Sequence, residues 1–214
     1  AAQTDAVWSL DRNSALGIEG GRNLQAALVT SAPQSEGVSL RIDAGNGDAS
    51  FVVQLANADE APGLSVQNYG SSEQPDIALT GGNLTHRVYL RADTNLEWHV
   101  HLSTQPTRSR FAYALHTDND RLLYQGELSE TDIAAGAERP DSVVGSYAVY
   151  HAHRQGNYQL SGSEGRSYRT GKICHIYRPK AWDSAGDTVW CTLSISEDSL
   201  VVTVPETFLS KAVY

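Results

Sequence analysis

The sequence has few cations, only two cysteines, no methionine and no long apolar run. Lysine and arginine together number 16 against 25 aspartates and glutamates, a formal net charge of −9. A non-specific nucleic-acid binder needs clustered cations to displace counterions from phosphates, so this balance excludes that class. No stretch approaches the roughly 18 apolar residues of a membrane-spanning helix, and no basic segment with an apolar core opens the chain. We therefore expect no nucleic-acid partner, no membrane span and no visible targeting segment.

The two cysteines also limit which kinds of protein this chain can be. Cys174 and Cys191 have neither the density of a secreted disulfide scaffold nor the Cys-x-x-Cys spacing of a metal pair. They either form one disulfide or remain two buried thiols on neighbouring strands. The chain begins at Ala1 and has no methionine, which fits removal of an initiator methionine or cleavage of a longer precursor.

What is present is typical of a β-protein. Hydrophobic residues make up 40% and charged residues 19% of the chain, with 18 glycines and 10 tyrosines. Helical periodicity is almost absent, and short helices are expected only at 130–137, capped by Ser129, and at 206–212 after Pro205. Strand-like segments separated by Gly, Asn, Asp, Ser or Pro are expected at 24–30, 38–43, 50–55, 86–91, 96–102, 111–116, 122–128, 147–152, 172–177, 189–195 and 200–204.

The fold class that follows is all-β: an antiparallel β-sandwich with one or two short helices, for which a jelly roll is one candidate arrangement. No helix long enough for a parallel crossover separates the strands. Asn46-Gly47, between two apolar segments, predicts a hairpin because its turn needs positive φ. The length fits a single β-rich domain over 1–214, with a weak candidate boundary at 106–110.

Two His-x-His motifs are the sharpest candidates for chemistry, His99-Val-His101 and His151-Ala-His153. Residues two apart on a strand point to one face, so such pairs could chelate zinc and need only a third ligand for a catalytic site. The competing interpretation is a solvated polar strand face. A third is a pH-sensitive interface, because histidine titrates near pH 6.5.

The pattern around His99 and His101 favours the interpretation as a solvated polar strand face. In 96–102 the apolar residues alternate, which leaves Glu97, His99 and His101 together on the opposite face. If the hairpin turns through 93–95, Glu97 pairs with Arg91 and His101 lies opposite Arg87. The positive charge of Arg87 beside His101 would disfavour zinc binding.

Other catalytic patterns are weaker. No Gly-x-Ser-x-Gly elbow is present, and Gly145-Ser146-Tyr147 lacks the strand–turn–helix context of a nucleophile, so Ser146 is expected in a strand. Neither glycine-rich stretch has the Lys and Ser/Thr of a phosphate-binding loop. The sequence therefore predicts no catalytic residue, no cofactor and no enzyme.

Tryptophan offers one binding candidate. Trp98 and Trp190 fall within alternating strands and are expected in the core. Trp182 lies in a turn-rich segment, where an exposed indole could stack on a sugar.

The second half of the chain contains four distinctive sequence motifs: Arg139-Pro-Asp-Ser-Val-Val-Gly-Ser-Tyr-Ala-Val-Tyr-His151, Tyr168-Arg-Thr-Gly-Lys172, His175-Ile-Tyr-Arg-Pro179 and Phe208-Leu-Ser-Lys-Ala-Val-Tyr214. Through these motifs, residues 110–214 resemble an uncharacterised protein family of tailed bacteriophages and environmental viral genomes. The resemblance implies a virion component, such as a head-decoration, tail or fibre protein, rather than a reaction.

A protein of that kind would be made in the host cytoplasm and become extracellular with the particle. Its partners would be copies of itself in a symmetric oligomer, other virion proteins, or both. The alternatives are a module that binds host-surface glycan through Trp182 and a zinc-binding β enzyme that uses the His-x-His pairs.

Overall fold

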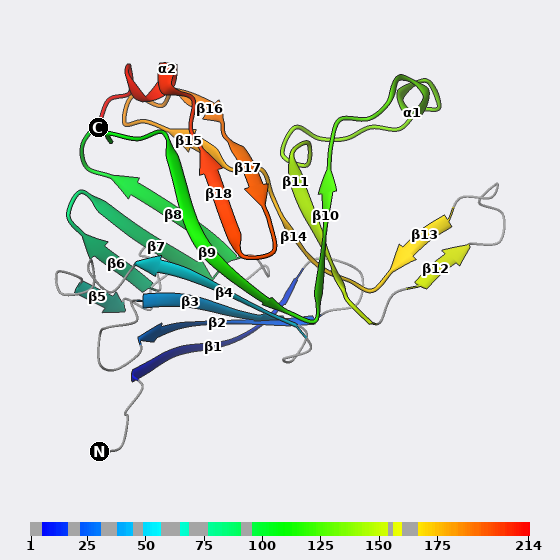
Figure 1. The fold of residues 1–214 in the computed structure, drawn as a ribbon, viewed down its shortest axis with the longest axis horizontal. Coiled ribbons are helices and arrows are strands. Elements are labelled where there is room, and N and C mark those ends of the chain that lie inside the picture. Colours follow the sequence, from blue (N-terminus) through cyan, green and yellow to red (C-terminus); the bar gives the residue numbers. More distant parts are fainter. Residues whose placement is uncertain are drawn as a thin grey trace.

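The computed structural model describes residues 6–16, 22–30, 38–44, 49–56, 65–68, 77–90, 96–153, 156–159 and 167–214 (Figure 1). The two helices among these residues are short, α1 (Glu130–Ala134) and α2 (Glu206–Leu209). The strands are β1 (Ala6–Leu16), β2 (Arg22–Thr30), β3 (Val38–Ala44), β4 (Ala49–Ala56), β5 (Ser65–Asn68), β6 (Ile77–Gly81), β7 (Leu84–Leu90), β8 (Leu96–Leu102), β9 (Arg110–Asp118), β10 (Asp120–Gln125), β11 (Ser146–His151), β12 (Gly156–Gln159), β13 (Ser167–Thr170), β14 (Lys172–Ile176), β15 (Lys180–Trp182), β16 (Thr188–Trp190), β17 (Thr192–Ile195) and β18 (Ser199–Thr203).

These strands form a seven-stranded sheet in the order β1-β2-β3-β4-β9-β18-β17 and a four-stranded sheet in the order β5-β6-β7-β8. A three-stranded sheet, β10-β11-β14, and the hairpins β12-β13 and β15-β16 complete the described pairings. All of these pairings are antiparallel. The predicted all-β, sandwich-like fold with two short helices is confirmed, and β1–β4 and β5–β8 each run as a meander.

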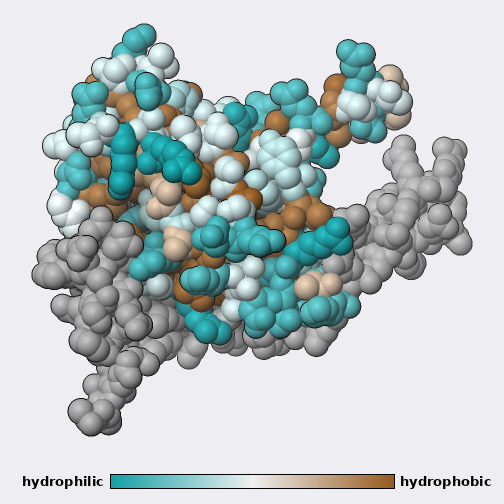
Figure 2. Space-filling view, viewed as in Figure 1, coloured by the Kyte–Doolittle hydropathy of each residue, from teal (hydrophilic) through white to brown (hydrophobic). Residues whose placement is uncertain are grey.

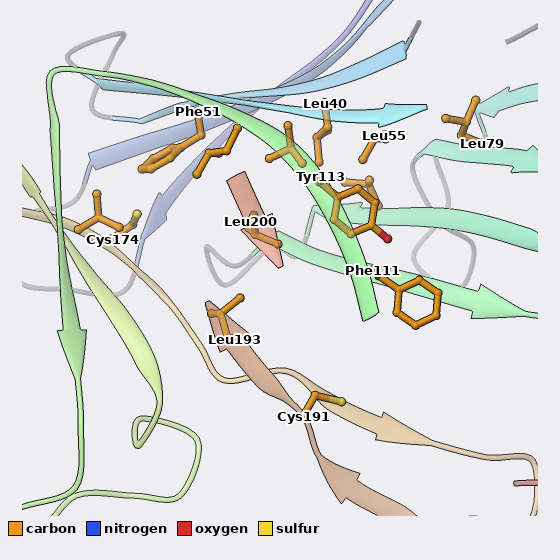
Figure 3. Close-up of a cluster of buried hydrophobic side chains, with 14 of the residues drawn as sticks. Leu40, Phe51, Leu55, Leu79, Phe111, Tyr113, Cys174, Cys191, Leu193 and Leu200 are labelled. Atoms are coloured by element: carbon orange, nitrogen blue, oxygen red, sulfur yellow. The ribbon is translucent and has the colours of Figure 1, made fainter. Parts of the chain in front are cut away.

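The core lies where the four-stranded sheet faces the seven-stranded sheet. Tyr113 of β9 reaches across, with its ring centroid 4.9 Å from that of Trp98 on β8 and 5.7 Å from that of His86 on β7. Leu40 and Leu55 belong to the same buried cluster and lie close to Tyr113 (Figure 3). Side chains of both inner faces therefore exclude water together, which is the main stabilising contribution of a sandwich.

The buried cluster continues into the C-terminal half. Val149 of β11, Ile173 of β14 and Leu209 of α2 belong to the same cluster as Leu40. The cluster thus contains residues from both sides of 106–110. β9, which begins at Arg110, pairs with β4 on one side and with β18 on the other.

One register prediction is wrong. The predicted turn at 93–95 lies outside the described residues, but the pairing of β7 with β8 differs from the predicted one by two residues. Glu97 consequently lies opposite Tyr89, and His101 lies opposite Thr85. Arg87 is the cross-strand partner of His99 instead.

The other elements predicted from local sequence patterns are present, with small differences in their bounds. The predicted strand 189–195 is divided at Cys191 into β16 and β17, and both helices end earlier than expected. Asn46-Gly47 lies outside the described residues, but the strands on either side of it pair as predicted, with Ala44 opposite Ala49. The predictions did not include β1, β5, β6, β12, β13 or β15.

Candidate functional site

The His-x-His motifs occupy different sheets. His99 and His101 lie on β8 of the four-stranded sheet, whereas His151 is the buried last residue of β11 in the three-stranded sheet. His153 lies past the end of that strand, and its backbone N–H donates to His151 Nδ1 at 3.0 Å. Within the described ranges, no three His, Cys, Asp or Glu residues are grouped so that they could hold a metal ion.

Trp182 and His99, which the sequence suggested for different chemistries, meet on the surface. Their ring centroids are 5.1 Å apart with the planes at 82°, and the His99 centroid lies 4.8 Å from that of Tyr89. β15 therefore brings Trp182 beside β8. Trp98 of β8 packs against the core, so the adjacent His99 lies on the opposite face of that strand. We call Tyr89, His99 and Trp182 the aromatic row.

Trp182 is 58% exposed at one end of the aromatic row, as the sequence suggested. Glu97 places a carboxylate next to the aromatic row, because its Oε2 lies 3.5 Å from His99 Nε2. The two side chains are 43% and 30% exposed, so solvent reaches both. The aromatic row thus combines an exposed indole with a carboxylate and an imidazole.

The turn after Trp182 is fixed by Asp183. Asp183 Oδ1 accepts hydrogen bonds from the backbone N–H groups of Ala185 and Asp187, each at 3.0 Å. Its Oδ2 accepts from the N–H of Val213 at 3.0 Å, which ties the C-terminal segment to the hairpin. These donors, Val213 foremost, hold the pKa of Asp183 below its ordinary value. These hydrogen bonds therefore hold the hairpin that carries Trp182 in one conformation.

Ser146 and His175 form a contact that the sequence analysis did not anticipate. Ser146 Oγ lies 2.6 Å from His175 Nε2, which superficially suggests a nucleophile and its base. However, Ser146 is fully buried as the first residue of β11, and its hydroxyl donates to the carbonyl of Val143. Burial, with the charge of Lys172, lowers the pKa of His175 to about 4. We interpret the pair as a brace between β11 and β14.

A buried carboxylate lies at the start of β10. Both oxygens of Asp120 are inaccessible and have no hydrogen-bond partner among the described residues. Burial, and then the charge of Asp118, raises the pKa of Asp120 to about 7. Burial, followed by the charge of Asp120, raises the pKa of the Cys174 thiol to about 12. This thiol is therefore protonated and a poor nucleophile at neutral pH.

The segment 126–145, here called the α1 arm, leaves the three-stranded sheet between β10 and β11 and carries α1 at its tip (Figure 1). It projects from the body of the molecule and presents mostly hydrophilic residues at its tip (Figure 2). Each residue from 129 to 138 is exposed, and Ile133 is 59% exposed. A hollow of about 270 Å³ lies at the base of the arm, lined by Tyr124, Glu127, Val144, Gly145, Arg178, Thr192 and Leu193.

No protein-family model, no curated protein and no solved structure matches the chain. Neither α1 nor α2, the helices in the described part of the chain, has the length and apolar character needed to cross a membrane. What the fold and surfaces define is an antiparallel β-protein with a projecting arm and an aromatic row.

Proposed function

We propose that this chain is a non-catalytic structural component of a bacteriophage particle, a head-decoration, tail or fibre protein, that works by assembling with further copies of itself. The resemblance of residues 110–214 to a phage protein family supports the virion setting. The α1 arm belongs to that part of the chain and supports assembly as its mode of action.

The observation that carries the proposal is that α1 is well formed and buries none of its residues. Isolated helices shorter than about 12–15 residues are marginal in water, and α1 has only five. Its capping box holds it locally, since Ser129 Oγ accepts from the Asp132 N–H at 3.2 Å while Asp132 Oδ2 accepts from the Ser129 N–H at 3.3 Å. An arm ordered in advance loses less conformational entropy on docking.

The base of the arm is also ordered. The N–H of Gly145 donates to the carbonyl of Gln125 at 2.7 Å, and the Arg139 guanidinium donates to the carbonyl of Gly126. Two chain segments are thereby closed against each other where the arm leaves the sheet. The arm is therefore suited to presenting Ile133 to a partner.

A second copy of this chain provides a complementary surface. The hollow at the base of the arm has apolar lining from Val144 and Leu193 and a cation from Arg178. Ile133 would enter it as the apolar anchor, and Glu130 and Asp132 beside it would face the guanidinium. Repeated from copy to copy, this contact is heterologous, and it generates a closed ring when the rotation between copies closes and a helical filament when it does not.

The test is the mass of the chain in solution, measured by light scattering during size-exclusion chromatography. We expect a stable closed oligomer with an interface of roughly 1,000 Å² or more. Ile133→Asp should reduce it to monomer, because it places a charge in the hollow, whereas Ile133→Leu should retain the oligomer. Thr192→Trp, which fills the hollow from an exposed position, should act like Ile133→Asp.

Circular dichroism of each variant provides the folding control. A strict monomer at high concentration, or an oligomer whose mass is indifferent to both Ile133→Asp and Thr192→Trp, would contradict the proposal. An oligomer that appears only on addition of another protein would indicate a different occupant of the hollow.

A further inference from the structure

The aromatic row takes no part in the arm contact proposed above. Its members come from three strands, β7, β8 and β15, and lie on the outer face of the four-stranded sheet. We propose that the aromatic row is a carbohydrate-binding site, and that its ligand is a pyranose residue of a neutral oligosaccharide whose C–H face stacks on the Trp182 indole.

Exposure and rigidity distinguish Trp182 from Trp98 and Trp190. Trp98 is partly buried against the core and donates through Nε1 to His86 Nδ1 at 3.1 Å. Trp190 is covered by cations, with Arg178 at 5.5 Å and Lys180 at 5.4 Å from its ring centroid. Trp182 is 58% exposed, and tryptophan is enriched at binding interfaces, where one part of the side chain stays apolar and the other reaches water.

The hairpin that carries Trp182 is pre-organised. Ala181 packs against the core cluster and lies opposite Val189 on β16. On the other side of Trp182, Asp183 holds the turn and the C-terminal segment through three backbone donors. Little chain entropy remains to be lost when a ligand stacks on the indole, so more of the contact energy contributes to affinity.

Polar groups beside the indole match a sugar rather than an apolar ligand. A carboxylate accepts several hydrogen bonds and an imidazole offers a donor or an acceptor, so Glu97 and His99 can both engage ring hydroxyls. A pyranose ring presents apolar C–H groups on its face and hydroxyls around its rim. The Trp182 indole offers an apolar surface for the first kind of group, and His99 with Glu97 offers polar atoms for the second.

The charge of the site disfavours acidic sugars. The carboxylate of Glu97 lies 3.5 Å from His99 of the aromatic row, and the chain carries a net charge of −9. A uronic or sialic acid residue placed on Trp182 would bring a second carboxylate close to Glu97 in a partly desolvated position, which is unfavourable. Neutral hexoses and N-acetylhexosamines avoid this repulsion.

A site of this size binds weakly. One stacked ring with two or three hydrogen bonds corresponds to a Kd of about 0.1–1 mM. Several copies on one particle would convert that affinity into strong attachment to a polysaccharide through multivalency. The site is therefore useful to a multimeric protein, although the inference does not depend on how the chain assembles.

The experiment is saturation-transfer difference NMR of the full chain with maltopentaose, cellopentaose, mannopentaose and chitopentaose, followed by titration. At least one of these oligosaccharides should bind in the stated range, with the strongest transfer to ring C–H protons. Trp182→Ala should weaken binding about tenfold or more, because the stacking surface is lost, and Trp182→Tyr should keep most of it. His99→Ala should weaken binding by a smaller factor.

Tyr177→Ala is the matched control, because Tyr177 is 56% exposed and lies outside the aromatic row. It should bind like the parent chain. The inference is overturned if none of the four oligosaccharides binds below 10 mM, which is about ten times the upper Kd expected. Binding that survives Trp182→Ala overturns it too, as does a Trp182→Ala variant whose only change is a lower mass in solution.

Discussion

Burial shifts the pKa values of His86 and Asp120 in opposite directions, so the two residues give the stability of the fold opposite dependences on pH. It lowers the pKa of His86 from 6.5 to about 4, so the contribution of its neutral form to stability is present above pH 6.5 and is lost as the pH falls toward 4. Burial, aided by Asp118, raises the pKa of Asp120 from 3.8 to about 7. Its protonated form contributes below pH 3.8, and that contribution is lost as the pH rises through 7. These trends oppose each other, so a variant is needed to separate them.

Asp120→Asn should stabilise the protein at neutral pH. The amide keeps the shape of the protonated carboxyl but cannot ionise, so the cost of burying a charge at the start of β10 disappears. We expect the free energy of unfolding at pH 8 to rise by about 1 kcal/mol, allowing for solvent screening of a half-buried group. The gain should vanish as the pH approaches 4. Urea unfolding across this pH range measures it.

Asp141→Asn is the control for the loss of one negative charge, since Asp141 is exposed on the α1 arm. It should change stability little at any pH. A destabilised Asp120→Asn at pH 8 would mean that the carboxylate is favourably solvated or paired in the fold.

At the scale of elements, the α1 arm should melt locally without weakening the rest of the fold. Ser129→Ala removes the side chain that accepts from the Asp132 N–H, and such a cap is worth about 1 kcal/mol. We expect amide exchange at Ala135 and Gly136, whose N–H groups bond to Thr131 and Ile133 carbonyls, to accelerate about fivefold. The global unfolding midpoint should not move, because α1 buries nothing. Thr131→Ala, at an exposed non-cap position, should leave exchange nearly unchanged.

Elements with a clear local pattern were predictable from the sequence, and elements set by tertiary packing were not. β9 and β8 alternate over many residues, and Ser129 with Asp132 marks the start of α1. β15 has only three residues, too few for a period to be recognised. The β7–β8 register could not be predicted either, because alternation fixes the face on which a residue lies but not the residue opposite it.

The same distinction applies to the candidate site. Exposure of Trp182 could be predicted from its turn-rich surroundings, because Pro179 and Gly186 punctuate that segment. Its contact with His99 could not, because the contact depends on how the β15-β16 hairpin packs against the edge of a separate sheet. The Ser146–His175 pair likewise follows from the β11–β14 register, which places Ala148 opposite His175.

At the scale of the whole molecule, one buried cluster joins sheets that are built from distant parts of the chain. β5–β8, which form the second sheet, lie between β4 and β9 in the sequence, and β18, near the C-terminal end, pairs with the other side of β9. Such pairings bring together residues that are far apart in sequence, and loop-closure entropy must be offset before they become favourable. Composition and alternation indicate the fold class, but they do not specify which strand lies beside which.

The two thiols report on the integrity of that cluster. Cys174 lies on β14 and Cys191 between β16 and β17; both are free, both are buried, and they lie well apart in Figure 3. The sequence had left open a disulfide and a pair of thiols on neighbouring strands, and the structure has separate thiols in one core.

Iodoacetamide should therefore label neither cysteine in the native protein and both in urea, without prior reduction. Cys191 is buried beside the β15–β16 hairpin and Cys174 within the three-stranded sheet, so labelling of either requires the fold to open. If the core is one cooperative unit, mass spectrometry at intermediate urea should find unlabelled and doubly labelled chains with few singly labelled ones. A large singly labelled population would show instead that the sheet containing Cys174 and the segment containing Cys191 unfold separately.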